Sequence, residues 1–187
     1  MDRGLVRNMV NVNGTNYDAT LEGGAAANAN DRLTFSFLGL TDCEGDVAVA
    51  DEWIVNTYWV NAANELMCMG SVDPGSAGLA LVTDVESFQV LYGIDDRVLS
   101  GALNGELIAA RYVRADQLLA THQVASIKIG LLIGTPVGGV GQASQQARNF
   151  MVLDKVLQAG VAPLDQPNLR RLFSTTIKIR NFDYNEV

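Results

Sequence analysis

Apolar and polar residues alternate along several stretches of this chain with a period of two, which is the spacing of a β-strand with one buried face. The cleanest alternation runs from Phe173 to Arg180. It predicts that Ile177 and Ile179 point into a core. The same register places Lys178 and Arg180 on the solvent side. We therefore expect this segment to be one of the main strands of the fold.

Four more stretches are predicted to be strands from their alternation or from their β-branched and aromatic residues. Ser87–Tyr92 has three apolar residues on one face, so we expect it to be half-buried. Gly93 is predicted to end it, because the chain must turn there. Trp53–Val60 is apolar on both faces and is predicted to be a central strand. The other two are Leu33–Leu38 and Ile127–Ile133.

Weaker signals fill the gaps between these strands. Residues 1–30 are predicted to be mostly loop, with a short helix at their start. Residues 142–159 fit either a loose helix or a strand over 149–153. The remaining signals predict a hairpin turn at 61–64, a return strand at 65–69, a strand at 107–113 and one or two helical turns at 116–120.

Length and composition limit the fold to one domain spanning residues 1–187. The chain is 48% hydrophobic and 18% charged, as is usual for a globular protein that can build a core. It has no apolar run of about 18 residues, so no transmembrane helix is expected. The many strands, little helix and short connections predict a β-rich α+β fold with a mainly antiparallel sheet.

The formal net charge of −8 excludes two classes of partner. Nucleic-acid binding depends on clustered Lys and Arg residues along the phosphates, and an anionic membrane surface requires the same sign of charge. We therefore expect no nucleic acid and no membrane-surface ligand. The acidity itself is explained by solubility.

The residues that could carry catalysis do not form a recognisable motif. The one histidine, His122, lies near Asp116 and Ser126 in sequence, but a catalytic triad is a spatial arrangement and no GxSxG elbow is present. The glycine-rich stretch 139–144 follows a strong strand, yet Ser144 replaces the third glycine of a dinucleotide-binding turn. We therefore expect no enzyme and no cofactor.

Acidic residues and one glycosylation pattern have equally plain explanations. Asp42, Glu44 and Asp46 alternate in one turn, and Asp95 is followed by Asp96. Calcium takes six to eight oxygens, which neither group supplies at the spacing of a full loop, so both are interpreted as solvated turn acids. Asn13-Gly14-Thr15 fits the acceptor pattern for N-glycosylation but is better explained as a turn. No metal site is expected.

The two cysteines, Cys43 and Cys68, leave two alternatives open. With a single histidine they cannot complete a four-ligand zinc site, and their spacing is too wide for a CxxC redox motif. Either they form a disulfide, which requires an oxidising compartment, or both are buried thiols.

Taken in order, several segments resemble the globular part of a PilW-type minor pilin of bacterial type IV pili. The resemblance covers most of the chain from Asn30 to Asn181, and it rests on the ordered set and not on any one motif. Cys43 and Cys68 fall where the paired cysteines of that family would lie, which implies a disulfide between them. The segments are Asn30–Phe35 with Thr41–Gly45, then Val85–Asp95, and finally Val124–Ile133 with Leu169–Asn181.

The resemblance implies a subunit that functions by contacting other proteins and not by catalysis. Such proteins are made as prepilins and are anchored in the inner membrane by a hydrophobic N-terminal helix, with the globular domain in the periplasm, until they enter the pilus. PilW-type subunits are thought to prime pilus assembly in a tip complex with other minor pilins. The anchor helix is missing from this sequence, so a soluble piece of the protein is expected, and the isolated domain is expected to be a monomer.

Two other functions compete with this one. The J-type pseudopilin of a type II secretion system is similar in architecture. A secreted β domain that binds carbohydrate or a cell surface would instead present Trp53, Trp59 or Tyr92 in an exposed pocket. The sequence also departs from the family, because the connection after Asp95 lacks the repeated Asp-Gly pattern of many relatives and residues 142–166 have no clear counterpart.

Overall fold

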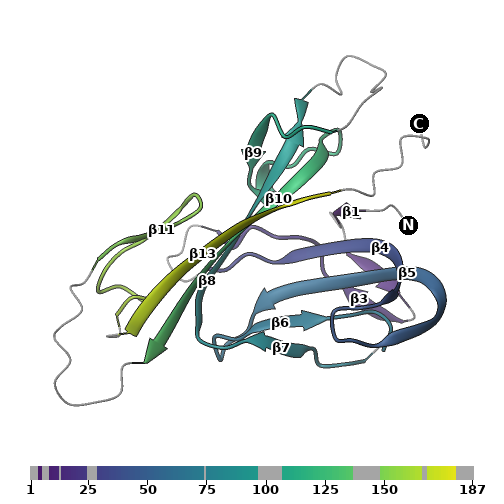
Figure 1. Cartoon of the computed structure of the whole chain (residues 1–187), viewed down its shortest axis with the longest axis horizontal. Helices are drawn as coiled ribbons and strands as arrows, with labels where there is room; N and C mark the ends of the chain where they lie inside the picture. Colours follow the sequence, from purple (N-terminus) through teal and green to yellow (C-terminus); the bar gives the residue numbers. More distant parts are fainter. Residues whose placement is uncertain are drawn as a thin grey trace.

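The protein is built almost entirely of antiparallel strands (Figure 1). The computed structural model describes residues 4–5, 9–12, 14–24, 29–73, 75–96, 107–136, 148–165 and 168–179. Helix is almost absent from these ranges, apart from the short 3-10 turn η2 (Ala115–Gln117), which overlaps the start of the segment 116–120 where helical turns were predicted. The β-rich, antiparallel part of the predicted fold class is confirmed, while its α component is not.

The first sheet contains five strands in the order β1-β4-β5-β6-β7. β4 and β5 form its long central hairpin, and the predicted return strand follows β5 through the turn at residues 61–64. The strands are β1 (Gly4–Leu5), β4 (Leu33–Thr41), β5 (Val47–Val60), β6 (Leu66–Met69) and β7 (Leu79–Val82).

The second sheet contains four strands in the order β13-β10-β8-β9. β8 and β10 pair along nearly their whole length, and β13 pairs with the other side of β10. β13 therefore lies at one edge and β9 at the other. The strands are β8 (Val85–Asp95), β9 (Arg111–Val113), β10 (Gln123–Pro136) and β13 (Asn168–Lys178).

Two short hairpins complete the described structure. β2 (Val10–Val12) pairs with β3 (Thr15–Tyr17), so the prediction that residues 1–30 are mostly loop was wrong for this part. β11 (Phe150–Val152) pairs with β12 (Lys155–Leu157), which decides in favour of a strand within 149–153. Residues 142–147, the other part of that ambiguous segment, lie outside the described ranges.

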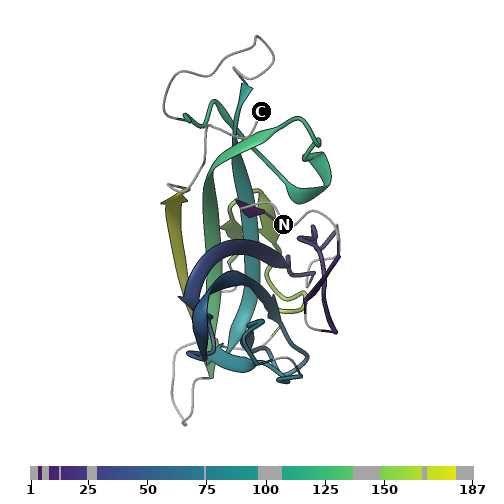
Figure 2. The ribbon, with the colours of Figure 1, turned by 90° about the vertical axis from the view of Figure 1, so that its right-hand side faces the viewer.

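The main core lies between the two sheets, whose stacking is visible in Figure 2. Leu33 and Leu66 of the first sheet belong to one cluster with Phe88 and Tyr92 of β8 and Ile127 of β10. Burying such side chains removes about 25 cal/mol per Å² of apolar surface from water, and this is the main favourable contribution to folding. The predicted face of β8 is thus confirmed as a core face.

β8 is buried on both faces and not on one, contrary to the sequence-based prediction. Its second face is covered by the β11–β12 hairpin, where Leu132 joins Val152 and Leu157 in a second cluster. Gly93 does not end the strand, which continues to Asp95. Glycine occupies position 93 because the space around it is crowded, and a side chain there would collide with Ser126.

The N-terminal hairpin is fastened to the first sheet by one buried tyrosine. Tyr17 has no exposed surface and packs against Val55 of β5. Its hydroxyl donates a hydrogen bond to the carbonyl oxygen of Gly70, 2.9 Å away. The hairpin is therefore part of the packed body.

The alternation in β13 predicted its secondary structure correctly but its burial wrongly. Ile177 is 50% exposed, although Lys178 faces solvent and Ile179 is partly buried, as predicted. Arg180 lies outside the described residues. Every residue from 171 to 178 is exposed, because β13 lies at the edge of its sheet and the first sheet does not extend over it.

Candidate functional site

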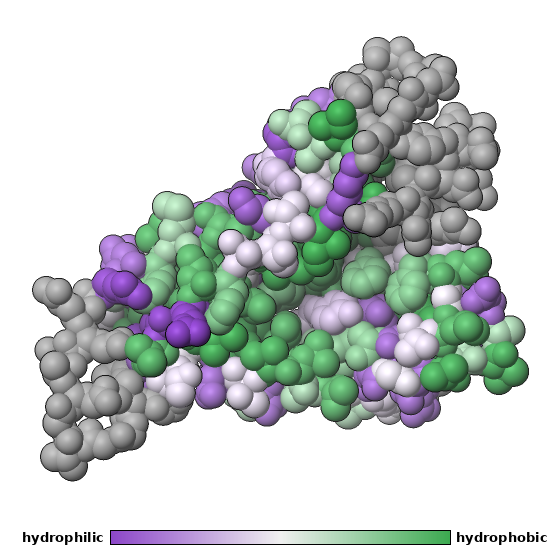
Figure 3. All heavy atoms as spheres, viewed as in Figure 1, coloured by the Kyte–Doolittle hydropathy of each residue, from purple (hydrophilic) through white to green (hydrophobic). Residues whose placement is uncertain are grey.

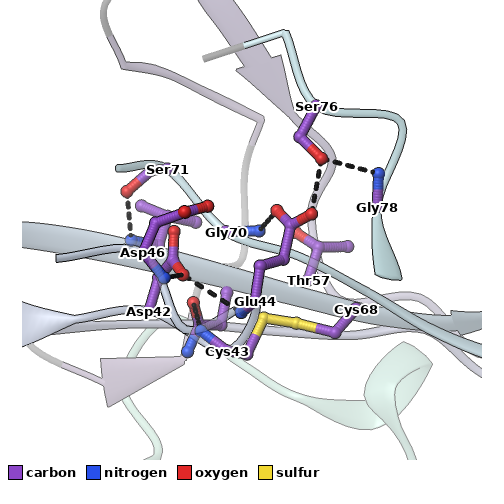
Figure 4. Close-up of a disulfide and its surroundings, with 12 residues drawn as sticks. Asp42, Cys43, Glu44, Asp46, Thr57, Cys68, Gly70, Ser71, Ser76 and Gly78 are labelled. Carbon is purple, nitrogen blue, oxygen red and sulfur yellow. Dashed lines mark hydrogen bonds between the residues drawn. A yellow bond between two sulfur atoms is a disulfide. The ribbon is translucent and has the colours of Figure 1, made fainter. Parts of the chain in front are cut away.

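A disulfide joins Cys43 to Cys68 and connects two parts of the first sheet (Figure 4). Cys43 lies in the turn between β4 and β5, and Cys68 is fully buried in β6. Their Cα atoms are 6.2 Å apart, and the two residues are 25 positions apart in the sequence. The backbone N–H of Cys43 also donates to Asn56 of β5 at 3.2 Å. The turn is therefore tied to both strands that follow it.

Asp42 organises the same turn from inside the protein. Its Oδ1 accepts hydrogen bonds from the backbone N–H groups of Glu44 and Asp46, at 3.0 and 3.1 Å. Its Oδ2 accepts one from Val72, at 3.1 Å. The interpretation of Asp42 as a solvated turn acid was wrong, because the residue is buried and satisfies backbone donors that would otherwise lack partners.

Glu44 extends this network to the loop after β6. Its Oε2 accepts a hydrogen bond from the backbone N–H of Gly70 at 2.7 Å, and its Oε1 accepts one from the hydroxyl of Ser76 (Figure 4). A side chain at Gly70 would collide with the Asp42 carboxylate, so glycine is required at this contact. The acidic turn and the loop from 70 to 78 thus form one hydrogen-bonded unit around the disulfide.

The three acids of this turn lie close enough together to repel one another. One carboxylate oxygen from each of Asp42, Glu44 and Asp46 falls within 4.8 Å of the others. The pKa of Asp46 is raised by loss of hydration and then by the negative charges of Asp42, Asp73 and Glu44. Since Asp42 and Glu44 already accept hydrogen bonds from the protein, we assign these carboxylates to shaping the turn.

The residues considered for a catalytic triad have separate partners. Asp116 forms an exposed ion pair with Arg114 at 3.0 Å. The hydroxyl of Ser126 lies 3.2 Å from that of Tyr112. His122 accepts a backbone hydrogen bond within its own turn through Nδ1, at 3.2 Å. Their proximity in sequence therefore does not produce a nucleophile–base pair.

The other candidates from the sequence also have structural roles or fall outside the described residues. Asp95 is buried and accepts a hydrogen bond from the backbone N–H of Ile108 at 2.9 Å, so its interpretation as a solvated turn acid was wrong. Asp96 is exposed and pairs with Arg111 at 3.0 Å. Tyr92 is fully buried in the main core, and both tryptophans are half-buried. Asn13 and the glycine-rich stretch 139–144 are outside the described ranges.

Comparison with known proteins identifies the family. Residues 54–181, about two thirds of the chain, match the family described as type IV pilus-assembly protein W, PilW. The chain belongs to the PilW family. This places it among proteins related to the type IV pilus, which are structural and associated with the periplasm and the pilus. In the ranges that the structure describes, no helix has the length and apolar character of a membrane span.

No curated protein matches this PilW-family chain, whereas four chains from solved structures match it. One of them is a type IV-like pilin from Thermus thermophilus, with a TM-score of 0.43 and 20% sequence identity. The similarity covers 82% of this chain and 78% of the other. The family match begins within β5, so it includes Cys68 but not Cys43.

Several charged residues of this PilW-family member are buried, and the sequence patterns did not reveal them. Asp31 is buried and accepts hydrogen bonds from the backbone N–H groups of Gly23 and Val90, at 2.8 and 2.7 Å. The pKa of nearby Glu22 is raised to about 7 by burial and then by the charge of Asp31. The sequence contains little indication that Asp31 and Glu22 are buried, because both lie in a segment without periodic apolar residues, where acids are usually solvated.

Proposed function

We propose that this chain is a minor pilin, a non-catalytic subunit that helps to prime type IV pilus assembly in a tip complex with other minor pilins. The observation that carries the proposal is the PilW family match over residues 54–181. The antiparallel, strand-built body is compatible with a subunit that works through its surfaces. In this proposal the full-length subunit is anchored in the inner membrane by an N-terminal hydrophobic helix and then enters the pilus.

The structural details support a subunit that binds other proteins in preference to an enzyme. Asp42 and Glu44 accept hydrogen bonds that stabilise the fold, and the described partners of Asp116, Ser126 and His122 do not form a triad. A disulfide is typical of proteins in an oxidising compartment, and the periplasm is one. The buried Tyr92 removes one of the aromatic residues on which the carbohydrate-binding alternative depended.

Deleting the gene in its host tests this proposal. We expect surface pili and twitching to fall sharply while the cellular pool of major pilin persists, and we expect the wild-type gene to restore both. Normal piliation in a strain without a second minor-pilin cluster would contradict the proposal. Loss of protein secretion with normal pili would point instead to the J-type pseudopilin.

A further inference from the structure

β13 is a long strand whose outer edge pairs with no other strand in the described part of the chain. The other edge strands that the structure describes are short, with two residues in β1, four in β7 and three in β9, whereas β13 has eleven. Short edges offer few unpaired backbone groups, while a long one is a template for another strand. In Figure 2 the outer side of β13, at the left of the molecule, has no described element beside it.

The side chains of this edge are unusually apolar for exposed positions. Leu169, Phe173 and Ile177 lie on the face that continues the main core, and between 48% and 57% of each is exposed. Leu172 is exposed on the opposite face. Figure 3, which looks onto the side where β13 lies, shows hydrophobic, intermediate and hydrophilic residues mixed along the diagonal of this strand. Arg171 and Thr175 separate the three apolar residues of this face. Large apolar side chains exposed together on one edge strand indicate an interaction site.

The sequence of β13 is complementary to itself. If two copies run antiparallel with Phe173 opposite Phe173, Leu169 of each copy lies opposite Ile177 of the other. These pairs fall on one face, because opposite residues in an antiparallel ladder share a face and alternate residues share it along each strand. Aromatic and aliphatic cross-strand pairs of this kind stabilise a sheet.

The charges are compatible with the same register. β13 carries three basic residues and no acid, so a poor register would bring like charges together. With Phe173 at the centre, Arg171 lies opposite Thr175, Arg170 opposite Thr176 and Lys178 opposite Asn168. Arg170 is also neutralised within its own chain by Glu86, at 2.6 Å.

We propose that β13 is a homodimerisation strand, which pairs antiparallel with β13 of a second copy about Phe173 and joins the two four-stranded sheets into one. The partner is a second copy and not a strand of another protein, because the apolar pairs and the absence of facing charges follow from this sequence alone. The dimer replaces the monomer expected from the sequence. It is independent of the proposed role in the pilus.

Cysteine cross-linking tests both the partner and the register. Both native cysteines are in the disulfide, so Phe173→Cys adds a single free thiol. In the proposed register the two copies of residue 173 lie opposite each other. The two copies of residue 177 are eight residues apart along the paired strands, which is about 27 Å at 3.4 Å per residue. Under mild oxidation we expect Phe173→Cys to form a covalent dimer and the matched control Ile177→Cys to form at least about tenfold less.

Light scattering of the unmodified chain provides the second measurement. We expect its mass to rise from monomer towards dimer as concentration increases to about 1 mM, and more so at high salt, because screening weakens repulsion between two molecules of net charge −8. Phe173→Lys should abolish this, since it sets two cations opposite each other. Val49→Lys, at a fully exposed position of β5, should leave it unchanged.

Three results would overturn the proposal. A chain that stays monomeric over the whole concentration range would refute dimerisation. The same result is expected if β13 pairs only with a strand of another protein, so that alternative would also contradict the proposal. Equal cross-linking at positions 173 and 177 would refute the register. Loss of the dimer in Val49→Lys as well as in Phe173→Lys would assign the association to another surface. Circular dichroism of each variant establishes that it is folded.

Discussion

Glu86 on β8 reaches across β10 to form a bidentate ion pair with Arg170 on β13. The two hydrogen bonds measure 2.6 and 3.0 Å, and both side chains are at least nine-tenths buried. Glu86 is the extra residue of a β-bulge, because Leu132 pairs with Ser87 and Ile133 with Val85. Gly134 lies between the two partners, and a side chain there would collide with the Glu86 carboxylate. This pair therefore holds β13 in place from two strands away.

Removing one partner of this buried pair should be costly. We predict that Arg170→Met lowers the free energy of unfolding by about 3–5 kcal/mol, because it leaves the Glu86 carboxylate buried without its cation. Urea denaturation gives the value. The matched control is Arg114→Met, whose ion pair with Asp116 is exposed to solvent and should contribute far less to stability. Equal losses in the two variants would contradict the assigned role.

The disulfide should contribute a large share of the stability. Cross-linking two cysteines that are 25 positions apart lowers the conformational entropy of the unfolded chain. In the loop-entropy model this raises the free energy of unfolding by about 3.5 kcal/mol. We therefore predict that reduction lowers the melting temperature by roughly 7–14 °C for a chain of this size. Calorimetry with and without reductant measures the shift, and mass spectrometry verifies the thiols. An unchanged melting temperature in fully reduced protein would show that the cross-link is dispensable.

The packing of β11–β12 on β10 depends on a glycine. We predict that Gly130→Ala lowers stability by about 1–3 kcal/mol, because its Cβ would lie 2.8 Å from Leu153 and 2.9 Å from Val152. Ser174→Ala, at the exposed position paired with Gly130, should change stability by no more than about 0.5 kcal/mol. Denaturant midpoints of the two variants make the comparison, and a tolerant Gly130 would mean that the hairpin packs loosely.

Stability should decline as the pH rises through the range in which Glu22 ionises. The pKa of Glu22 is raised from 4.5 to about 7 by burial first and then by Asp31 and Asp154. The folded state therefore binds this proton more tightly than the unfolded state, so the contribution is complete below about pH 4.5 and is lost by about pH 7. The pKa of Asp31 is raised in the same direction, also mainly by burial.

Glu22→Gln tests this assignment. The stability of the variant should decline less than that of the wild type between pH 5 and pH 8, so the variant should be more stable than the wild type at pH 8. Glu52→Gln, which removes an exposed carboxylate from β5, is the matched control and should retain the wild-type profile. Parallel wild-type and Glu22→Gln profiles of denaturant midpoint against pH would exclude Glu22 as the titrating group.

Periodicity predicted the long strands well but not what covers them. The alternation from Phe88 to Tyr92 correctly gave one core face of β8, yet the second face is buried by a hairpin distant in sequence. Ile177 shows the reverse error, since its alternation is perfect but it is 50% exposed, with no described layer packed over it. The strands β2 and β3 have three residues each, which is too short for a period to be detected.

The candidate site shows the same limit. The pairing of Cys43 with Cys68 came from family resemblance, because spacing alone left a buried-thiol alternative. The burial of Asp42 could not be inferred, since an acidic turn is usually solvated and the backbone donors that Asp42 satisfies, such as that of Val72, are distant in sequence.

The hydrogen bond from Tyr17 to Gly70 also has a mechanical consequence. It fastens the N-terminal hairpin next to β6, the strand that the disulfide ties to the β4–β5 turn. A pulling force applied on the N-terminal side of Tyr17 would therefore be passed to a covalently cross-linked part of the sheet. Under such tension the hairpin should detach while the sheet behind it keeps its connectivity, and pulling single molecules with and without reductant would resolve the two steps.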